Sequence, residues 1–321
     1  MSYVKRSLLL VLGLAAAGVA WGNDVYPTKA VKILVGFAPG GATDLLARIY
    51  ATKLSAKFDK SFIVENRPGA GGNTAIQALT QSAPDGYTIA MGANYIAANA
   101  AFNRNAYDWD RELAPIALIA YTPNVLVVPA NSKFQNVNDI IQQAKKPNSH
   151  LTFASAGMGS SIHLAGELFK MMAGVNMVHV PYKGVSPAEV DLMAGTVDMM
   201  FGSISTAIPL INAKKLKILA ITGKERIKEY PDVPTLDESG LRGYDVGATF
   251  LMVAPAKVPA EILNKLADAV AEISRHPDVV SQVERIYAKP LTGGPAATKT
   301  FLKGEFDKWQ GLVKATGLKF E

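Results

Sequence analysis

The 321-residue sequence contains no cysteine and only four histidines. Without cysteine the chain forms no disulfide, holds no thiolate-bound metal, has no cysteine nucleophile and cannot be lipid-modified at an N-terminal cysteine. The histidines do not have the spacing of zinc ligands; they are His150, His163, His179 and His276. We therefore expect no metal site in this protein.

Clusters of one charge and long uncharged apolar runs are also missing. The formal net charge is +6, but no stretch of five to eight residues is rich in lysine and arginine, so nucleic acid is not an expected partner. A bilayer crossing needs roughly 20 apolar residues, and no segment reaches that length without a charge or a glycine. With 49% hydrophobic and 19% charged residues, the composition is that of a globular protein and not of a disordered chain.

The motifs of nucleotide binding and of serine hydrolases are absent as well. The glycine-rich stretch at residues 67–73 lacks the third glycine of a dinucleotide-binding loop. Neither a P-loop nor the G-x-S-x-G motif occurs, and no nucleophile is paired with a base. We expect no cofactor and no catalytic residues.

The first 22 residues have the pattern of a secretory signal. Lys5 and Arg6 precede an apolar run from Leu8 to Val19, and small residues follow as far as Gly22. The run is too short to cross a bilayer, so we expect cleavage after Gly22 and a periplasmic protein that begins at Asn23. An uncleaved membrane anchor is the alternative.

The remaining length and pattern predict an α/β protein with two lobes. A chain of 321 residues exceeds what one hydrophobic core usually supports. Apolar strands alternate with helical periodicity, which is typical of a mainly parallel sheet covered by helices. The first such unit begins with a strand at Val31–Phe37, and a second begins with a strand at Leu151–Ala154.

Two extended apolar segments bounded by proline, Asn124–Pro129 and Thr249–Pro255, are predicted to be crossover strands between the lobes. We expect lobe 1 to comprise residues 23–123 and 246–321, and lobe 2 to comprise residues 124–245. The amphipathic segments at Ala260–Ser274 and near residues 297–315 are expected to pack back onto lobe 1. One large doubly wound domain is the alternative, since length alone does not exclude it.

Each predicted lobe carries a glycine-rich turn between its first strand and the following helix. These turns are Ala38–Asp44 and Ser155–Ser161. Helix starts have backbone N–H groups without partners and bind anions through them, and glycine lets a ligand approach the backbone closely. If the lobes face each other, both turns look into one cleft. Ser160 is also a candidate cap for the helix that follows.

Other polar and aromatic residues follow predicted strands. Tyr182 and Lys183 are candidates for an aromatic wall and a cation in the cleft, although a solvated loop is an open alternative. His163 and Glu167 lie one helical turn apart, a spacing that fits a ligand or metal contact but more often marks a local contact.

Several motifs occur in order along the chain. They are Phe37-Ala38-Pro39-Gly40-Gly41 with Asp44 and Arg48, Val64–Gly72, Pro84–Tyr87, His163–Glu167 and Val180–Gly184. With them the chain resembles the Bug family, the extracytoplasmic receptors of tripartite tricarboxylate transporters, from about Tyr26 to the C-terminus. The resemblance implies a Venus-flytrap fold of the periplasmic binding protein class, type II-like, with two crossover strands.

The resemblance also implies a site in which the loops after the first strand of each lobe hold the carboxylate of a small organic ligand. Carried over by position, these loops contribute Gly40, Gly41, Ala42, Thr43 and Asp44 from lobe 1, and Ser155, Ala156, Gly157, Gly159 and Ser160 from lobe 2. The far end of the ligand is expected near Asn94, Tyr95, Tyr182 and Phe201. The identity of the ligand stays open.

The resulting hypothesis is a monomeric solute-binding protein that delivers a carboxylate to integral membrane components of a transporter. Two alternatives use the same residues. The first is a carboxylate sensor that feeds a signalling system. The second is an exported enzyme acting on an organic acid, with His163 or Asp44 as acid or base.

Overall fold

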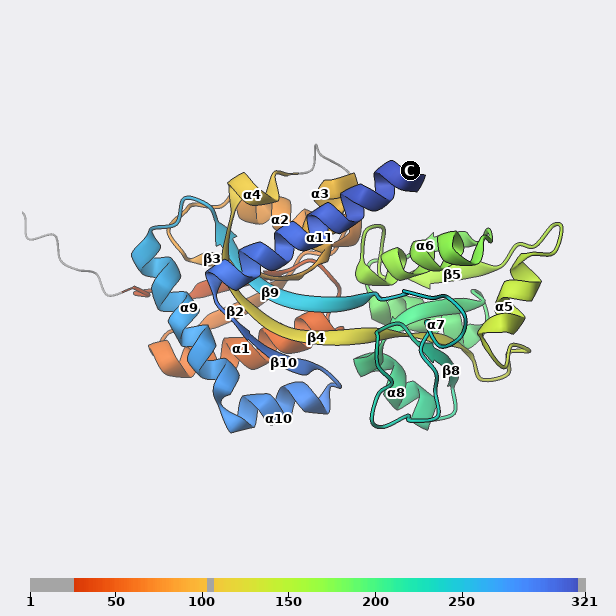
Figure 1. Cartoon of the computed structure of the whole chain (residues 1–321). Helices are drawn as coiled ribbons and strands as arrows, with labels where there is room; N and C mark the ends of the chain where they lie inside the picture. The colour runs from red at the N-terminus through yellow and green to blue at the C-terminus, as the bar shows by residue number, and fades with distance from the viewer. Residues whose placement is uncertain (1–25, 103–106, 317–321) are drawn as a thin grey trace, which may run out of the picture.

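The computed structural model describes residues 26–102 and 107–316, and the expected signal segment, residues 1–22, lies outside them. Among the described residues a ten-stranded sheet has the order β2-β1-β3-β9-β4-β7-β5-β6, and β8 and β10 also pair with β4. The sheet is divided between two lobes that share its long central strand (Figure 1).

Lobe 1 is built on β1 (Val31–Val35), which pairs in parallel with β2 (Phe62–Asn66) and β3 (Thr88–Ala93). Its helices include α1 (Ala42–Phe58), α2 (Asn73–Thr80), α9 (Ala260–Arg275) and α10 (Pro277–Arg285), with the short 3₁₀ turn η1 (Ala70–Gly72) before α2. The inward side chains of β1, among them Val31, Ile33 and Val35, are fully buried in the first of two hydrophobic cores.

Lobe 2 repeats the arrangement around β5 (Thr152–Ser155), which pairs in parallel with β6 (Val178–Pro181) and β7 (Met199–Ser203). Strand β8 (Leu216–Ile221) and four helices complete it: α5 (Val137–Ala144), α6 (Ser161–Ala173), α7 (Val185–Ala194) and α8 (Ile204–Asn212). Phe153, Phe169 and Phe201 pack together in the second core.

Two long strands connect the lobes. Strand β4 (Leu113–Pro129) pairs with β9 (Gly247–Pro255) up to Pro123 and with β7 from Asn124 onward. The predicted crossover segments are therefore the ends of longer strands. Strand β9 runs antiparallel to β3 and to β4, and β4 runs antiparallel to β7, so the sheet as a whole is mixed. The prediction of a mainly parallel sheet holds only within each lobe, for β1–β3 and for β5–β7.

The Thr222 side chain joins the two strands where they pass between the lobes. Its hydroxyl accepts a hydrogen bond from the Asn124 N–H at 2.8 Å. The same oxygen lies 2.8 Å from the Asn124 carbonyl and 2.6 Å from the Val246 carbonyl, so it donates to one of them. Thr222 is fully buried, so these bonds are shielded from water.

The last helix contacts both lobes. In α11 (Pro295–Thr316), Leu302 packs in the first core and Trp309 in the second. Trp309 also contacts Phe102 of α3 (Tyr95–Phe102), and Figure 1 shows α11 passing beside α3 toward lobe 2. The prediction that the C-terminal segment packs back onto lobe 1 thus describes only part of its contacts. The remaining elements, α4 (Trp109–Glu112) and β10 (Lys289–Gly293), flank β4.

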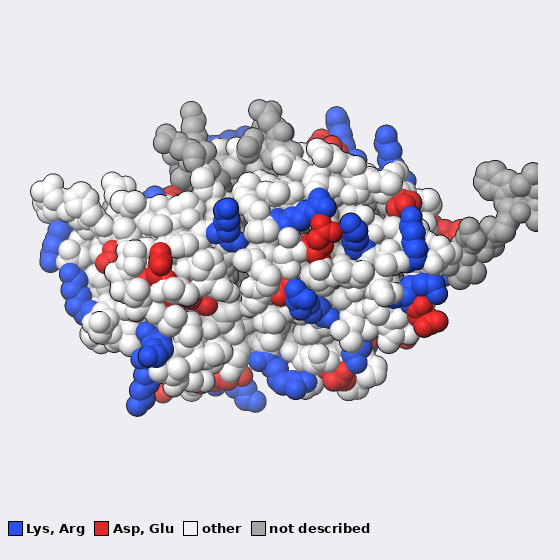
Figure 2. Space-filling model, turned by 180° about the vertical axis from the view of Figure 1, so that it is seen from behind, with Lys and Arg blue, Asp and Glu red and all other residues white. Residues whose placement is uncertain are grey.

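Across the described ranges, no helix combines the length and the apolar character that a membrane crossing requires. On the face shown in Figure 2, basic and acidic side chains are interspersed, without an extended region of one sign.

Replacing Thr222 by valine keeps the side-chain volume and removes the hydroxyl from both connecting strands. We expect Thr222→Val to lower the free energy of unfolding by about 2–3 kcal/mol, because buried N–H and C=O groups lose their partner. Urea denaturation of the mature protein measures the change. Thr52→Val is the control, since the Thr52 hydroxyl is exposed and bonds only within its own helix; an equal loss in both variants would contradict the role of Thr222.

Candidate ligand-binding site

A small cavity of about 50 Å³ lies between the lobes, where one helix of each lobe begins. No charged side chain lines it among the residues that the structure describes. The lining comprises Phe37, Gly41, Ala42, Thr43, Ala93, Tyr95, Asn124, Ala156, Ser160, Ser161, Ile162, Val185, Ser203, Ala248 and Phe250.

Lobe 1 presents the start of α1 to this cavity. Gly41 is the N-cap residue and makes no side-chain cap, while the Gly40 N–H donates to Asp44 Oδ2 at 3.0 Å. The first N–H groups of a helix have no intrahelical acceptor. Within the described chain the N–H groups of Gly41, Ala42 and Thr43 also find no other partner, and these residues line the cavity.

The Asp44 carboxylate holds the turn before α1 in place through hydrogen bonds. Its carboxylate accepts two hydrogen bonds from Arg48, at 2.9 and 3.0 Å, and one from Asn66 at 3.0 Å. Burial opposes ionisation of Asp44, but the bonds from Arg48, Gly40 and Asn66 outweigh it and lower the pKa of the carboxyl. Asp44 is therefore an ionised, fully engaged group that fixes the turn at Gly40.

Lobe 2 presents the start of α6. As predicted, Ser160 is its N-cap, accepting from the His163 N–H at 3.2 Å while donating to the Gly157 carbonyl at 2.7 Å. The two glycine N–H groups of the turn are engaged inside the lobe: that of Gly157 with Ser155 Oγ and that of Gly159 with His163 Nδ1. The N–H groups without a partner in the described chain include those of Ala156, Ser161 and Ile162, which line the cavity.

Two stacked histidines support this second turn. The His163 and His179 rings lie 4.1 Å apart, and His179 Nε2 is 2.7 Å from Ser155 Oγ. Burial lowers the pKa of His163 to about 3, with further contributions from His179 and Lys170. Burial and Lys170 lower the pKa of His179 to about 4. Both rings are neutral at pH 7, and His163 Nδ1, which accepts from Gly159, carries no proton.

The lobes touch beside the cavity at two glycines. A side-chain Cβ at Gly71 would lie 1.6 Å from the Met158 carbonyl oxygen, and one at Gly159 would lie 1.7 Å from Asn99 Oδ1. The Ala38 N–H also donates to the Lys183 carbonyl across the gap at 3.2 Å. The lobes are thus in contact with each other, and the two helix starts border one cavity between them.

The structure places six of the predicted binding residues on the cavity: Gly41, Ala42, Thr43, Tyr95, Ala156 and Ser160. It places eight outside the lining: Gly40, Asp44, Asn94, Ser155, Gly157, Gly159, Tyr182 and Phe201. Asn94 bonds the Gly247 carbonyl and Glu305. Tyr182 donates to Asp191, and Phe201 is in the second core.

Several lining residues are not among the fourteen binding residues predicted above, although Ser203 belongs to the stretch Phe201-Gly202-Ser203, which the sequence marks as small-residue access beyond a strand. Ser203 ends β7 and Ala93 ends β3, so the rule that ligands bind beyond the carboxyl ends of strands identifies both. Asn124, Ala248 and Phe250 belong to the connecting strands, and no local pattern marks them. Asn124 is 1% exposed, and its side-chain Nδ2 has no hydrogen-bond partner in the described chain.

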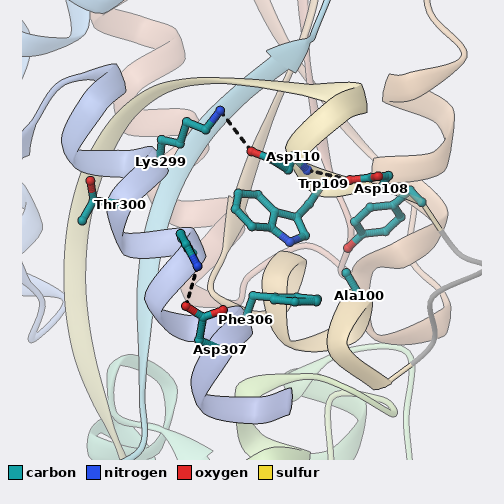
Figure 3. Close-up of a pocket in the computed structure, with 10 residues that line it drawn as sticks. Ala100, Asp108, Trp109, Asp110, Lys299, Thr300, Phe306 and Asp307 are labelled. Carbon is teal, nitrogen blue, oxygen red and sulfur yellow. Dashed lines mark hydrogen bonds and ion pairs between the residues drawn. The ribbon is translucent and has the colours of Figure 1, made fainter. Parts of the chain in front are cut away.

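Two larger hollows are less suited to a ligand. One of about 660 Å³ lies between α4 and α11 over Tyr107, Trp109 and Phe306, where Lys299 pairs with Asp110 and Lys303 with Asp307 (Figure 3). The other, of about 760 Å³, lies beside the connecting strands near Tyr121 and Tyr287. Neither is bordered by a pair of facing helix starts.

The fold and the paired helix starts are those of a two-lobed solute-binding protein of the periplasmic binding class. The family model described as tripartite tricarboxylate transporter family receptor matches residues 46–318. The chain belongs to this family, and the resemblance to Bug proteins is confirmed.

Sequence relatives and solved structures agree with this assignment. Protein BugT of Bordetella pertussis is 32% identical over 321 residues, covering 98% of each chain. An adipate-bound structure of Rpa4515 from R. palustris has a TM-score of 0.87 at 33% identity, covering 92% of this chain and 99% of its own. The structure of MatC from Rhodopseudomonas palustris with bound malate has a TM-score of 0.85 at 31% identity. The match covers 90% of this chain and 100% of the MatC chain.

The lowered pKa values of the two histidines predict a pH-dependent stability. Between pH 6.5 and 4 the unfolded chain takes up protons on both residues while the folded chain does not, so stability falls as the pH falls. We expect the His179→Gln variant to take up about one proton fewer than the wild type when it unfolds near pH 5. The slope of its unfolding free energy against pH is then smaller by the same amount. Urea denaturation between pH 7 and 4 measures it. His150→Gln, at an exposed position, serves as control, and equal slopes in all three proteins would refute the assignment.

Proposed function

We propose that this protein is a periplasmic receptor that captures a small organic carboxylate between its lobes and delivers it to membrane components of a transporter. The observation that carries the proposal is the pair of helix starts, α1 from lobe 1 and α6 from lobe 2, bordering one cavity between the lobes. We place one lobe boundary between residues 123 and 124, where β4 exchanges β9 for β7, and the other between 245 and 246, just before β9 begins.

The binding chemistry follows from the backbone. Uncommitted N–H groups at a helix start carry partial positive charge, roughly half an elementary charge for each helix, and suit a carboxylate without any cationic side chain. A carboxylate that bonds to both helices joins the lobes and stabilises the closed form. The carboxylates bound by Rpa4515 and MatC support the ligand class.

Export and delivery are inferred from the N-terminal sequence and the family. We expect the mature protein to begin at Asn23, to accumulate in the periplasm and to be a monomer. Mass spectrometry of the periplasmic fraction and light scattering after gel filtration test these expectations; a chain retained in the membrane with Lys5 and Arg6 intact would overturn the first.

A thermal-shift screen of small carboxylates tests the binding function directly. A ligand that binds only the folded state raises the melting temperature, and small-angle scattering of the same samples should detect compaction as the lobes close. No response to any organic acid would reject the proposal. Slower uptake of the labelled acid by cells lacking the gene supports delivery, whereas normal uptake with loss of an acid-dependent transcriptional response would identify a sensor.

Closure itself is tested at Gly71. We expect Gly71→Ala to weaken carboxylate binding about 10- to 100-fold, because its methyl group meets the Met158 carbonyl when the lobes close. Isothermal titration calorimetry measures the affinity. Gly195→Ala is matched to it, since Gly195 also has a positive φ of 75° but has open space around its Cβ position; equal affinity in both variants would contradict this closed form.

A further inference from the structure

We propose that capture of the carboxylate is coupled to the uptake of a proton by Glu189, a buried carboxyl beside the first turn of α8. This inference rests on the proposed carboxylate-binding function and adds a regulation of the same site by pH. It follows from the burial of Glu189, from the hydrogen bonds around it and from the position of α8 at the cavity.

The Glu189 side chain is enclosed within lobe 2. It belongs to α7, which packs against α8 and against strands β4, β5 and β7, and it is 6% exposed. The Thr206 hydroxyl, in the first turn of α8, lies 2.5 Å from Glu189 Oε1 and is the one hydrogen-bond partner of this carboxyl in the described chain. A carboxyl in such a place is costly to ionise unless a cation pairs with it.

Among the described residues, no cation pairs with the Glu189 carboxyl. The elements α8, β5 and β7 have no ionisable side chain, and β4 has only Tyr121, in the part that pairs with β9. The other ionisable residue of α7 is Asp191, which accepts from the Tyr182 hydroxyl. Burial raises the pKa of Glu189 to about 7, although the bond from Thr206 lowers it.

The charged groups of lobe 1 near α7 are paired with each other. Helix α7 meets lobe 1 where Val185 approaches Gly41, and the charged residues in the first turns of α1 are Asp44 and Arg48, which form an ion pair. Burial and the Thr206 bond alone account for the shifted pKa of Glu189.

The hydrogen bonds around Thr206 favour a protonated Glu189. Thr206 Oγ1 lies 2.5 Å from Glu189 Oε1 and 3.2 Å from the Ser203 carbonyl oxygen. A hydroxyl has one proton, so beside an ionised carboxylate it donates to only one of these two acceptors. A protonated Glu189 donates to Thr206, and Thr206 then donates to Ser203, so both bonds form together.

Ser203 connects this group to the cavity. It is the N-cap residue of α8, makes no side-chain cap and lines the cavity. The N–H groups in the first turn of α8 have no intrahelical acceptor and carry partial positive charge. An ionised Glu189 interacts favourably with that charge when no ligand is bound. A bound carboxylate takes over this interaction and repels the ionised form, so binding raises the pKa of Glu189 further and a proton is taken up.

The coupling gives the affinity a definite direction with pH. Protonation of Glu189 strengthens carboxylate binding by the same factor by which binding strengthens protonation. Above about pH 7 the free receptor loses this proton, so affinity falls as the pH rises. We expect binding to be about fivefold or more weaker at pH 8.5 than at pH 6.5. His163 and His179 stay neutral over this range and do not contribute.

Calorimetry on the mature wild-type protein tests the coupling. The probes are malate and adipate, which are bound in the MatC and Rpa4515 structures, or, if neither binds, the acid with the largest thermal shift. Titrations at pH 7.5 in HEPES and in Tris, which differ in ionisation enthalpy, count the protons exchanged. We expect an uptake of roughly half a proton for each acid bound.

A Glu189→Gln variant assigns the proton to this residue. Glutamine keeps the shape of the side chain and donates to Thr206 as a protonated carboxyl does, but it has no proton to gain. We expect the variant to bind the acid about as tightly at pH 8.5 as at pH 6.5, without proton uptake. Glu229→Gln, at an exposed position of lobe 2, should keep the pH dependence of the wild type.

The outcomes separate the two proposals. If an acid binds but the wild type takes up no proton, or if the Glu189→Gln variant keeps the wild-type pH dependence, the coupling is wrong and the receptor function stands. If no organic acid binds the wild type at any pH, both are rejected.

Discussion

The proposed site depends on peptide N–H groups at two helix starts that find no partner in the described part of the chain. In lobe 1, Asp44 engages the Gly40 N–H and leaves the next three groups uncommitted. In lobe 2, Ser155 and His163 engage the Gly157 and Gly159 N–H groups. Buried side chains thus fix both turns, and the cavity receives only those backbone donors that no side chain has taken.

Neutral histidines make this arrangement possible in lobe 2. A protonated His163 could not accept from the Gly159 N–H, and a positive charge would be buried beside Phe153 and His179. The same burial that lowers both pKa values therefore preserves the turn over the physiological range. An acid or base role for His163 or Asp44 has little geometric support, because each group already holds a loop in place.

The sequence allowed the two lobes, their opening strand-turn-helix units and the Ser160 cap to be predicted, because each depends on residues close together in the chain. It did not reveal that β4 begins at Leu113, since Pro115 and Pro123 resemble strand breaks; the register shift after Pro115 accommodates the first. Asn124 and Phe250 reach the site only through the pairing of strands distant in sequence. The engaged glycine N–H groups of lobe 2 depend on His163 and Ser155 side chains, whose direction no pattern specifies.

The lobe-to-lobe contact joins Gly71 to the Met158 carbonyl and Gly159 to the Asn99 side chain, whereas other residues form the walls of the cavity. The two can therefore diverge independently over evolution. Substitutions at wall positions such as Ile162 or Val185 can change which solute is accepted while the outer shape of the closed receptor is preserved. A membrane partner that recognises that shape could then bind receptors with different ligand specificities without any change in its own docking surface.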